Sequence, residues 1–252
     1  MNPGLNFSDQ KVLVTGSTTG IGAAIVNDFL ELGAHVMITG YNQEELDLAR
    51  EKNQEKKFHN AEYIHVDFND ETSLSRFLTK ISKLNELHVC INNAGSNRNN
   101  PIDETRIEDY DYLHQVNLKS PFLICREVSK IMKKQKYGRI VNIASIWSVI
   151  SRAKRSVYSI TKFGIVGLTK SVSADLAPYG ILVNAVSPGF TLTELTKKTV
   201  PENEIKMLSN MIPMQRFAEP SEISKIVIFL SSSLNTYLTG QNVIIDGGFT
   251  SV

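Results

Sequence analysis

The feature that most constrains this chain is an apolar run that leads at once into a glycine-rich turn. Lys11–Thr15 contains β-branched residues and predicts a buried strand. Glycines follow at Gly16, Gly20 and Gly22, and residues 23–32 have helical periodicity. A strand, a glycine turn and a helix in this order are typical of dinucleotide binding, because the backbone can approach a pyrophosphate at the helix N-terminus. A tight structural turn is the alternative.

The alternation of strand and helix continues to the end of the chain. Further runs that predict strands lie at 34–39, 63–67, 88–91, 139–145, 181–186 and 242–246. The pattern predicts one α/β domain over residues 1–252, a Rossmann-type doubly wound parallel sheet of seven strands with helices on both faces. Residues 190–213, mixed in composition, predict a mobile substrate lid.

Composition excludes several classes of protein. The formal net charge of +1 gives no field that would attract nucleic acid or an anionic membrane. No apolar run reaches the length of about 18 residues that a membrane span needs, and the N-terminus does not resemble a secretory signal. Cys90 and Cys125 lie in apolar segments and predict buried side chains rather than metal ligands or a disulfide. We expect a cytoplasmic protein that needs no metal.

Two segments carry residues suited to proton transfer. Tyr158 and Lys162 lie four apart in a predicted helix, so they share one face. A phenol has a pKa of about 10, and a neighbouring ammonium lowers that pKa by favouring the phenolate. Ser145 ends an apolar run, where its hydroxyl could bind a carbonyl oxygen beside the phenol. An ordinary helix face is the alternative for the Tyr–Lys pair.

Polar residues at another strand end point to the same crevice. Asn92–Gly95 follow the apolar run that ends at Ile91, at the edge where α/β sheets bind ligands; a structural turn is the alternative. Asn117 lies in a long predicted helix, residues 107–135. We expect that helix to bend between Asn117 and Pro121, because both residue types disfavour helix interiors.

Together these residues resemble the short-chain dehydrogenase/reductase family over nearly the whole chain. The motifs occur in the family's order and spacing: Thr15-Gly-x-x-x-Gly20-Ile-Gly22, Asn92-Asn-Ala-Gly95, Asn117, Ser145, Tyr158-x-x-x-Lys162 and Pro188-Gly189. Residues 138–145 and the ending Asp246-Gly-Gly are similar to the branch that includes 3-oxoacyl-(acyl-carrier-protein) reductases and sugar or polyol dehydrogenases.

The resemblance implies an NAD(P)-dependent oxidoreductase that transfers a hydride between nicotinamide and a carbonyl or secondary alcohol. A 3-oxoacyl thioester is the implied substrate. A sugar or polyol is the alternative, and a non-catalytic dinucleotide-binding regulator is a third reading. Tyr158 would transfer the proton, Lys162 would bind the nicotinamide ribose and lower the pKa of Tyr158, and Ser145 would hold the substrate oxygen. Asn117 would hold a water that relays protons to Lys162.

The resemblance also implies the cofactor contacts and the assembly. Asp67 would meet the adenine, and Thr191 the nicotinamide amide. The family usually forms homotetramers through helices that correspond to residues 107–135 and 158–177. Phe122, Ile131, Phe163, Val166 and Leu168 would supply the apolar surface. The implied cofactor-binding set is Gly16, Ser17, Thr18, Thr19, Gly20, Ile21, Gly22, Tyr41, Asn42, Asp67, Phe68, Asn93, Ala94, Gly95, Tyr158, Lys162, Pro188, Gly189 and Thr191.

The residues that would select the cofactor are neutral. Gly40 stands where NAD enzymes of this type usually place Asp, whose carboxylate repels a 2′-phosphate. Tyr41 and Thr19 stand where NADP enzymes usually offer a basic residue. Without the carboxylate, nothing at this position repels the 2′-phosphate of NADP. Without the arginine, only an additional attraction to that phosphate is lost. We therefore predict that NADP(H) is favoured and that NAD(H) is possible.

The substrate-selecting stretches are 96–100, 146–156 and 190–213, and their composition does not name a ligand. Arg152, Lys154 and Arg155 predict either contact with an anionic substrate or a solvated loop. Acyl-carrier reductases often carry basic residues on the long helices. Lys130 could serve in that role, but Ala174 stands where an arginine is expected, which disfavours a carrier-protein substrate.

Overall fold

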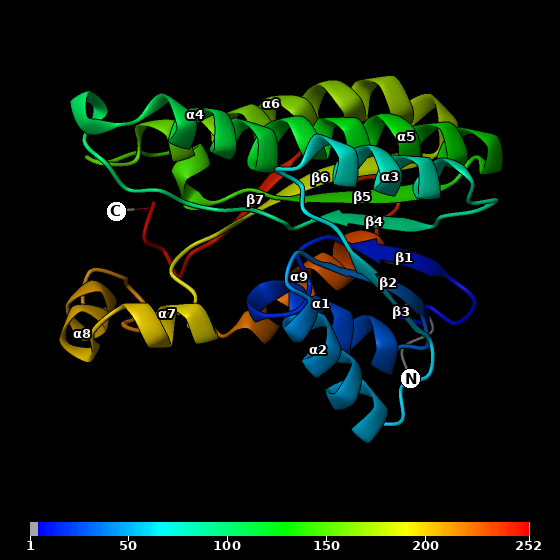
Figure 1. Cartoon of the computed structure of the whole chain (residues 1–252), viewed down its shortest axis with the longest axis horizontal. Helices are drawn as coiled ribbons and strands as arrows, with labels where there is room; N and C mark the ends of the chain where they lie inside the picture. The colour runs from blue at the N-terminus through cyan, green and yellow to red at the C-terminus, as the bar shows by residue number, and fades with distance from the viewer. Residues whose placement is uncertain (1–4, 252) are drawn as a thin grey trace.

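The computed structural model describes residues 5–251 and confirms the predicted fold class (Figure 1). Seven parallel strands pair in the order β3-β2-β1-β4-β5-β6-β7. The order reverses between β1 and β4, which opens a ligand crevice at the carboxyl ends of these strands. Residues 1–4 and 252 of the predicted domain lie outside the described residues. The strands are β1 (Lys11–Val14), β2 (His35–Gly40), β3 (Ala61–His65), β4 (Val89–Asn92), β5 (Gly138–Ile143), β6 (Ile181–Pro188) and β7 (Asn242–Ile245).

Two helical layers cover the sheet because successive residues of a strand face opposite sides. Val12 and Val14 belong to one apolar core, and Leu13 belongs to the other. The first core is covered by α1 (Gly20–Glu31) and α9 (Pro220–Ser231), and α2 (Gln43–Glu55) lies on the same side. The opposite layer holds α3 (Glu71–Ser82), α4 (Ile107–His114), α5 (Ser120–Gln135) and α6 (Ser156–Leu176). No helix within residues 5–251 is long and apolar enough to cross a membrane.

The long helix predicted over 107–135 is interrupted by a π-helix at Gln115–Lys119. Pro121 lies in the first turn of α5, where its missing N–H costs little. The hydroxyl of Ser120 donates to the carbonyl of Gln115 at 2.8 Å. The expected irregularity is therefore a widened turn rather than a proline kink, and it buries Asn117.

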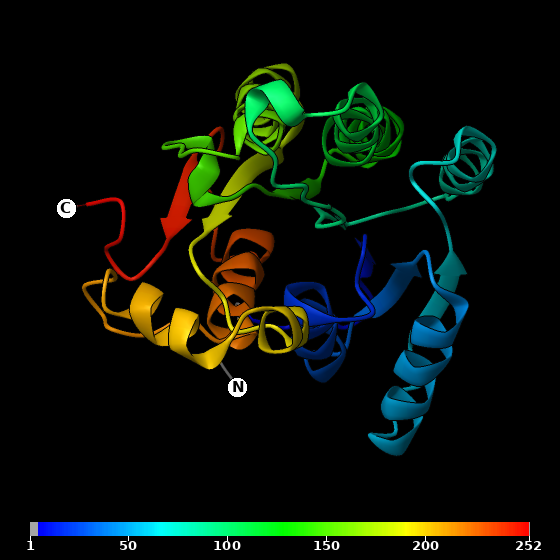
Figure 2. The same cartoon turned by 60° about the vertical axis from the view of Figure 1, so that its left-hand side comes forward.

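The segment 190–213 contains two short helices, α7 (Glu194–Thr199) and α8 (Glu202–Ser209). Figures 1 and 2 place them together beyond β6, apart from both helical layers. Leu208, Ile212 and Phe217 form an apolar cluster of their own there, with Phe190 and Phe249 packed against it. The segment thus has a small separate core, and its role as a substrate lid stays a prediction.

Candidate active site

Hydrogen bonds between the carboxyl ends of β1 and β4 hold the glycine turn. The side-chain amide of Asn93 donates to the carbonyls of Thr15 (3.0 Å) and Gly16 (2.7 Å). The hydroxyl of Thr15 accepts from the backbone N–H groups of Asn93 (2.9 Å) and Ala94 (3.0 Å). A side-chain carbon on Gly22 would lie 2.4 Å from the Gly16 carbonyl oxygen. Glycine is therefore required at position 22 by close packing within the turn.

The first turn of α1 fits a pyrophosphate. Its N-cap residue, Thr19, makes no side-chain cap hydrogen bond, and the first turn contains no acidic residue. In contrast, the side chains of Asn42 and Asp70 cap α2 and α3. Uncapped N–H groups at the positive end of a helix dipole bind phosphate oxygens. The residues present therefore fit a dinucleotide, with the turn 16–22 at the pyrophosphate.

The other predicted cofactor residues follow β2, β3 and β6. Tyr41 is 69% exposed and free to meet a ring, while the side-chain oxygen of Asn42 already accepts from two backbone N–H groups of α2. A carboxylate oxygen of Asp67 accepts from the N–H of Asn69 at 2.8 Å. Thr191 is nearly buried, and its hydroxyl donates to the Gly189 carbonyl at 3.2 Å.

The cofactor-selecting position holds a carboxylate that the sequence analysis missed. A Glu45 carboxylate oxygen accepts from the hydroxyl of Thr18 at 2.9 Å. The sequence of α2 does not show which side chains of its first turn point toward the glycine turn, so this contact could not be predicted. Gly40 itself is small for packing reasons, since a side-chain carbon there would lie 2.7 Å from the Thr18 methyl group and 3.2 Å from Leu46.

Tyr158, Lys162 and Ser145 come together where β5 meets α6. Lys162 is only 4% exposed. Its ammonium donates to the carbonyl of Ile143 at 2.9 Å and lies 5.6 Å from the centre of the Tyr158 ring. Ser145 follows β5, and its hydroxyl accepts from the N–H of Trp147 at 3.3 Å. A phenol, an ammonium and a hydroxyl thus share one end of the sheet.

Burial shifts the pKa of both titratable groups in this cluster. It lowers the pKa of Lys162 to about 8. It raises the pKa of Tyr158, while a hydrogen bond with Ser145 and the positive charge of Arg155 act in the opposite direction. The expected lowering of the Tyr158 pKa by Lys162 is not seen. Ser145 and Arg155 favour the phenolate instead.

Asn117 joins the loop after β4 to the helix that carries Tyr158 and Lys162. Its side-chain oxygen accepts from the N–H of Ser96 at 2.8 Å. Its amide nitrogen donates to the Ser96 carbonyl (2.9 Å) and to the Thr161 hydroxyl (3.2 Å). A carbon built on Gly95 would lie 3.5 Å from the Asn117 side-chain oxygen and 3.6 Å from the Lys162 ammonium. Thr161 was not predicted as a site residue, and Ser96 was predicted only within the substrate-selecting stretch 96–100, because the roles of both depend on this long-range contact.

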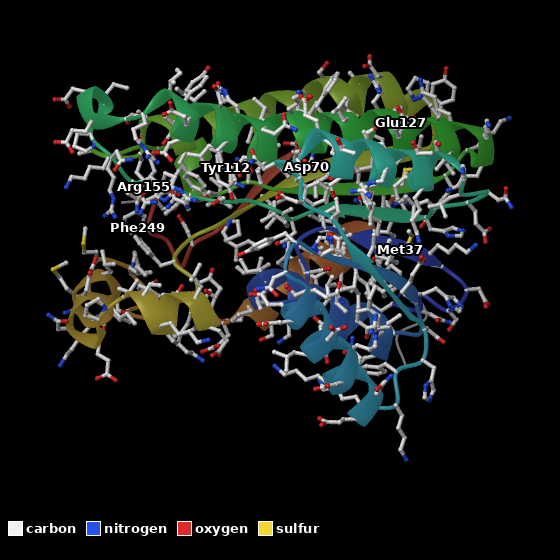
Figure 3. The ribbon with its side chains drawn as sticks, viewed as in Figure 1. Met37, Asp70, Tyr112, Glu127, Arg155 and Phe249 are labelled. Atoms are coloured by element: carbon white, nitrogen blue, oxygen red, sulfur yellow. The ribbon has the colours of Figure 1, made fainter. Side chains whose placement is uncertain are left out.

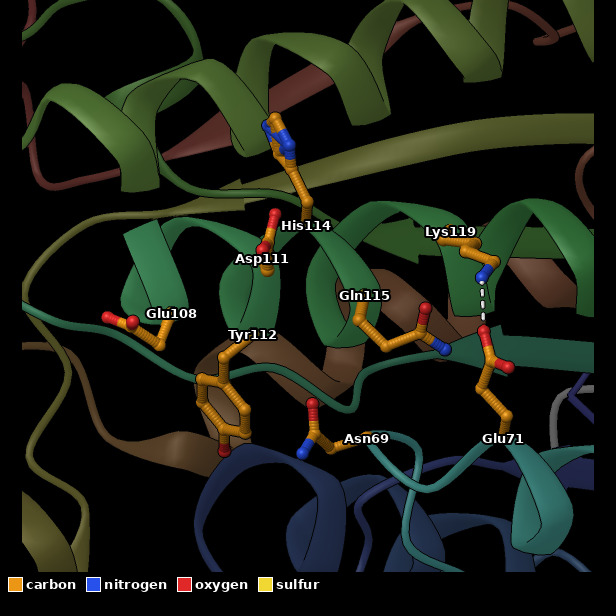
Figure 4. A pocket seen from close by; sticks show the side chains of 8 residues that line it. All are labelled: Asn69, Glu71, Glu108, Asp111, Tyr112, His114, Gln115 and Lys119. Carbon is orange, nitrogen blue, oxygen red and sulfur yellow. Dashed lines mark hydrogen bonds and ion pairs between the residues drawn. The ribbon is translucent and has the colours of Figure 1, made fainter. Parts of the chain in front are cut away.

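A separate hollow of about 570 Å³ lies between the start of α3 and α4 (Figure 4). None of the four catalytic candidates lines it. All the residues that line it have side chains with polar groups, and an ion pair of 2.9 Å between Lys119 and Glu71 lies along it. The candidate active site is therefore assigned from its chemistry and not from this hollow. The lining residues are Asn69, Glu71, Glu108, Asp111, Tyr112, His114, Gln115 and Lys119.

Known proteins resemble this chain over almost its full length. A family model described as Enoyl-(Acyl carrier protein) reductase matches residues 16–250. The 3-oxoacyl-[acyl-carrier-protein] reductase FabG of Aquifex aeolicus is 37% identical over 238 residues, covering 94% of this chain and 95% of that protein.

Among solved structures, a gluconate 5-dehydrogenase from Burkholderia cenocepacia, in complex with NADP and tartrate, matches with a TM-score of 0.89. It is 29% identical and covers 98% of each chain. The structure titled ElxO with NADP bound matches with a TM-score of 0.87 at 31% identity, covering 96% of this chain and 99% of that one.

The chain belongs to the short-chain dehydrogenase/reductase family. The predicted family, fold class and class of chemistry are thereby confirmed: this dehydrogenase/reductase is an NAD(P)-dependent oxidoreductase of CH–OH and carbonyl groups. The roles of the individual site residues stay predictions.

We predict that Lys162→Met increases stability while abolishing turnover. The lowered pKa means that Lys162 holds its proton less tightly in the folded protein than in the unfolded chain. The charged lysine therefore destabilises the folded state. The penalty is fully present below about pH 8 and disappears as the pH rises past the usual 10.5. Lowering the pKa to about 8 corresponds to about 3 kcal/mol. Methionine cannot donate a hydrogen bond to the Ile143 carbonyl. The loss of that hydrogen bond destabilises the variant by about 1–2 kcal/mol, which reduces the net gain in stability.

Thermal unfolding at pH 7 should therefore give Lys162→Met a Tm a few degrees above that of the parent. The gain should shrink as the pH approaches 10.5, where the parent lysine is neutral in both states. Lys154→Met, at an exposed position, serves as the matched control and should leave Tm unchanged. A lower Tm for Lys162→Met at pH 7 would contradict the burial penalty assigned to this lysine.

Proposed function

We propose that this protein reduces a carbonyl group, or oxidises the matching secondary alcohol, with NADP(H) as the favoured cofactor and NAD(H) as possible. The observation that carries the proposal is the buried Lys162 ammonium, one helical turn from Tyr158, whose phenol meets Ser145. This cluster lies beside Gly95, in the crevice where the strand order reverses.

In the proposed mechanism the protein positions the substrate and moves protons. The cofactor, when bound, supplies or accepts the hydride. Ser145 donates a hydrogen bond to the substrate oxygen, and Tyr158 protonates that oxygen during reduction or accepts the alcohol proton during oxidation. Lys162 places a positive charge beside the phenolate that forms. Asn117 keeps α6 in register with the loop after β4.

The cofactor preference follows from the neutral selecting residues and from two relatives. The B. cenocepacia enzyme and ElxO both carry NADP in their structures, which supports NADP(H) for this chain. Ser17 is buried and its hydroxyl donates to the Val14 carbonyl at 2.7 Å, and the Thr18 hydroxyl donates to Glu45, so Thr19 is the hydroxyl of the turn that we propose for a 2′-phosphate. The Glu45 carboxylate, bonded to Thr18, opposes that phosphate, so we propose a preference weaker than an arginine would give.

Two substrate classes are supported. The A. aeolicus relative and the family model favour a 3-oxoacyl thioester. The similarity to the gluconate 5-dehydrogenase supports a sugar acid as the substrate, and so does the positive charge of the loop 151–156. Lys130 could have contacted an acidic carrier protein, but it is already paired with Glu127 at 2.6 Å. A carrier protein is therefore the less supported form of the thioester.

We also propose a cytoplasmic homotetramer in which residues 190–213 cover the substrate. Phe122 on α5 and Phe163 on α6 are 49% and 48% exposed, and Val166 and Leu168 are partly buried. Ile131 is only 6% exposed and belongs to a core, so it does not supply interface surface as expected. The buried, unpaired cysteines Cys90 and Cys125 fit a reducing compartment.

We predict that Tyr158→Phe binds NADPH as tightly as the parent but loses about 10²–10⁴-fold in kcat, because a proton donor contributes on that order. Turnover should be followed at the nicotinamide absorbance with acetoacetyl-coenzyme A and with D-gluconate. Tyr179→Phe, at an exposed position in the 3-10 turn that follows α6, is the control and should keep full activity. Retention of most activity by Tyr158→Phe would show that another group donates the proton.

We predict that Glu45→Gln shifts the ratio of dissociation constants about fivefold toward NADP, since removing a charge near the 2′-phosphate is worth about 1 kcal/mol. Calorimetric titration with NADP and NAD measures the ratio. Glu44→Gln in the same turn, with an exposed side chain, should leave it unchanged. The prediction is wrong if the ratio does not move for Glu45→Gln, or if the parent binds NAD about tenfold tighter than NADP.

We predict that light scattering gives about four times the chain mass of 28.1 kDa. Phe163→Glu should lower the mass, because a charge would be buried in the interface between α5 and α6 helices. Tyr237→Glu changes a side chain that is 95% exposed and should leave the mass unchanged. A parent protein that is monomeric at micromolar concentration would contradict the assembly.

A further inference from the structure

Two arginines without acidic partners lie on one tryptophan beside the catalytic candidates. The guanidinium carbons of Arg152 and Arg155 lie 5.3 Å and 5.5 Å from the centre of the Trp147 ring. Within residues 5–251 neither guanidinium forms an ion pair or a hydrogen bond. Residues 151–156 contain three cationic side chains and no acidic one. This arginine pair therefore carries a local positive charge that the protein does not neutralise.

The arrangement is electrostatically unfavourable on its own. Attraction to the indole face holds each guanidinium in place, but two like charges on one ring repel each other. Burial and the charge of Arg152 both lower the pKa of Arg155. An anion that contacted both groups would relieve the repulsion, because a guanidinium binds a carboxylate through two parallel hydrogen bonds.

The arginine pair is fixed to the candidate active site. Trp147 is only 7% exposed, and its backbone N–H donates to the Ser145 hydroxyl at 3.3 Å. Arg155 is the N-cap residue of α6, three positions before Tyr158, and its charge acts on that phenol. In Figure 3, Arg155 lies at the end of the molecule that carries α7 and α8. A bound anion and the reacting carbon would thus be close enough to belong to one small molecule.

We propose that Arg152 and Arg155, held on Trp147, form a subsite for the carboxylate of a small oxo or hydroxy acid, whose carbonyl or alcohol group meets Ser145 and Tyr158. The inference rests on the proposed function, and it selects the sugar-acid class over an uncharged acyl chain. Arg152 and Arg155 are positioning and specificity residues, and Ser145 and Tyr158 carry the reaction.

Trp147 is the single tryptophan of the chain, so its fluorescence reports on this subsite without any turnover. The NADP-bound Tyr158→Phe protein, in which oxidation of gluconate is suppressed, should be titrated at constant ionic strength with D-gluconate and with D-glucitol, which carries an uncharged CH2OH group in place of the carboxylate. We expect a saturable change with gluconate and none with glucitol. Arg155→Gln should weaken gluconate binding at least about tenfold, and Arg155→Lys should restore part of it.

Lys134→Gln, which removes an exposed charge from α5, should leave the gluconate titration unchanged. Equal responses to gluconate and glucitol, or parent-like gluconate binding by Arg155→Gln, would overturn the proposal. Tighter binding of inorganic phosphate than of gluconate would also overturn it in favour of a phosphorylated ligand. Reduction of acetoacetyl-coenzyme A without gluconate binding leaves the proposed function standing and removes the subsite. Gluconate binding that depends on Arg155, without turnover of any substrate, would support the subsite and contradict the proposed function.

Discussion

The hydrogen bonds exchanged by Asn93 and Thr15 across the ends of β1 and β4 are the constraint on which the site depends. They fix the glycine turn at one end, and Ser96 continues the same segment to Asn117 and from there to α6. A buried amide that lost its partner would cost about 1–3 kcal/mol, so this network has one favourable arrangement. The position of Tyr158 relative to the turn is thus set by short amide and hydroxyl contacts rather than by long flexible side chains.

The site maintains positive charge where burial opposes it. Among the described residues, 5–251, the enclosed Lys162 ammonium has only the Ile143 carbonyl as a hydrogen-bond acceptor, and Arg155 lies beside Arg152 with no acidic partner. Neither arrangement is what stability alone would select. Both are suited to negative charge: the Tyr158 phenolate or a substrate oxyanion near Lys162, and the carboxylate of a ligand at the arginine pair. The electrostatics and the proposed chemistry therefore agree.

Much of this was predictable from the sequence because the signals are local. Apolar runs marked every strand within a few residues, and the spacing of Tyr158 and Lys162 placed them on one helix face. What could not be predicted depends on how distant segments meet. Glu45 reaches Thr18 only because of how α2 packs, and Ile131 is buried because α5 presents it to the sheet. The pKa of Tyr158 was expected to fall beside Lys162, but burial raises it, and Ser145 and Arg155 rather than Lys162 oppose that rise.

In the proposed reaction a hydride passes between nicotinamide and a substrate carbon held beside Tyr158. The most direct test uses NADPH that carries deuterium at the transferred position of the nicotinamide ring. The carbonyl substrates are 5-oxogluconate and acetoacetyl-coenzyme A. Mass spectrometry and NMR locate the deuterium in the product. The account predicts deuterium on the new carbinol carbon of the product in ordinary water, and none at that carbon when unlabelled NADPH is used in D2O. A carbinol carbon that takes its hydrogen from solvent would contradict the account.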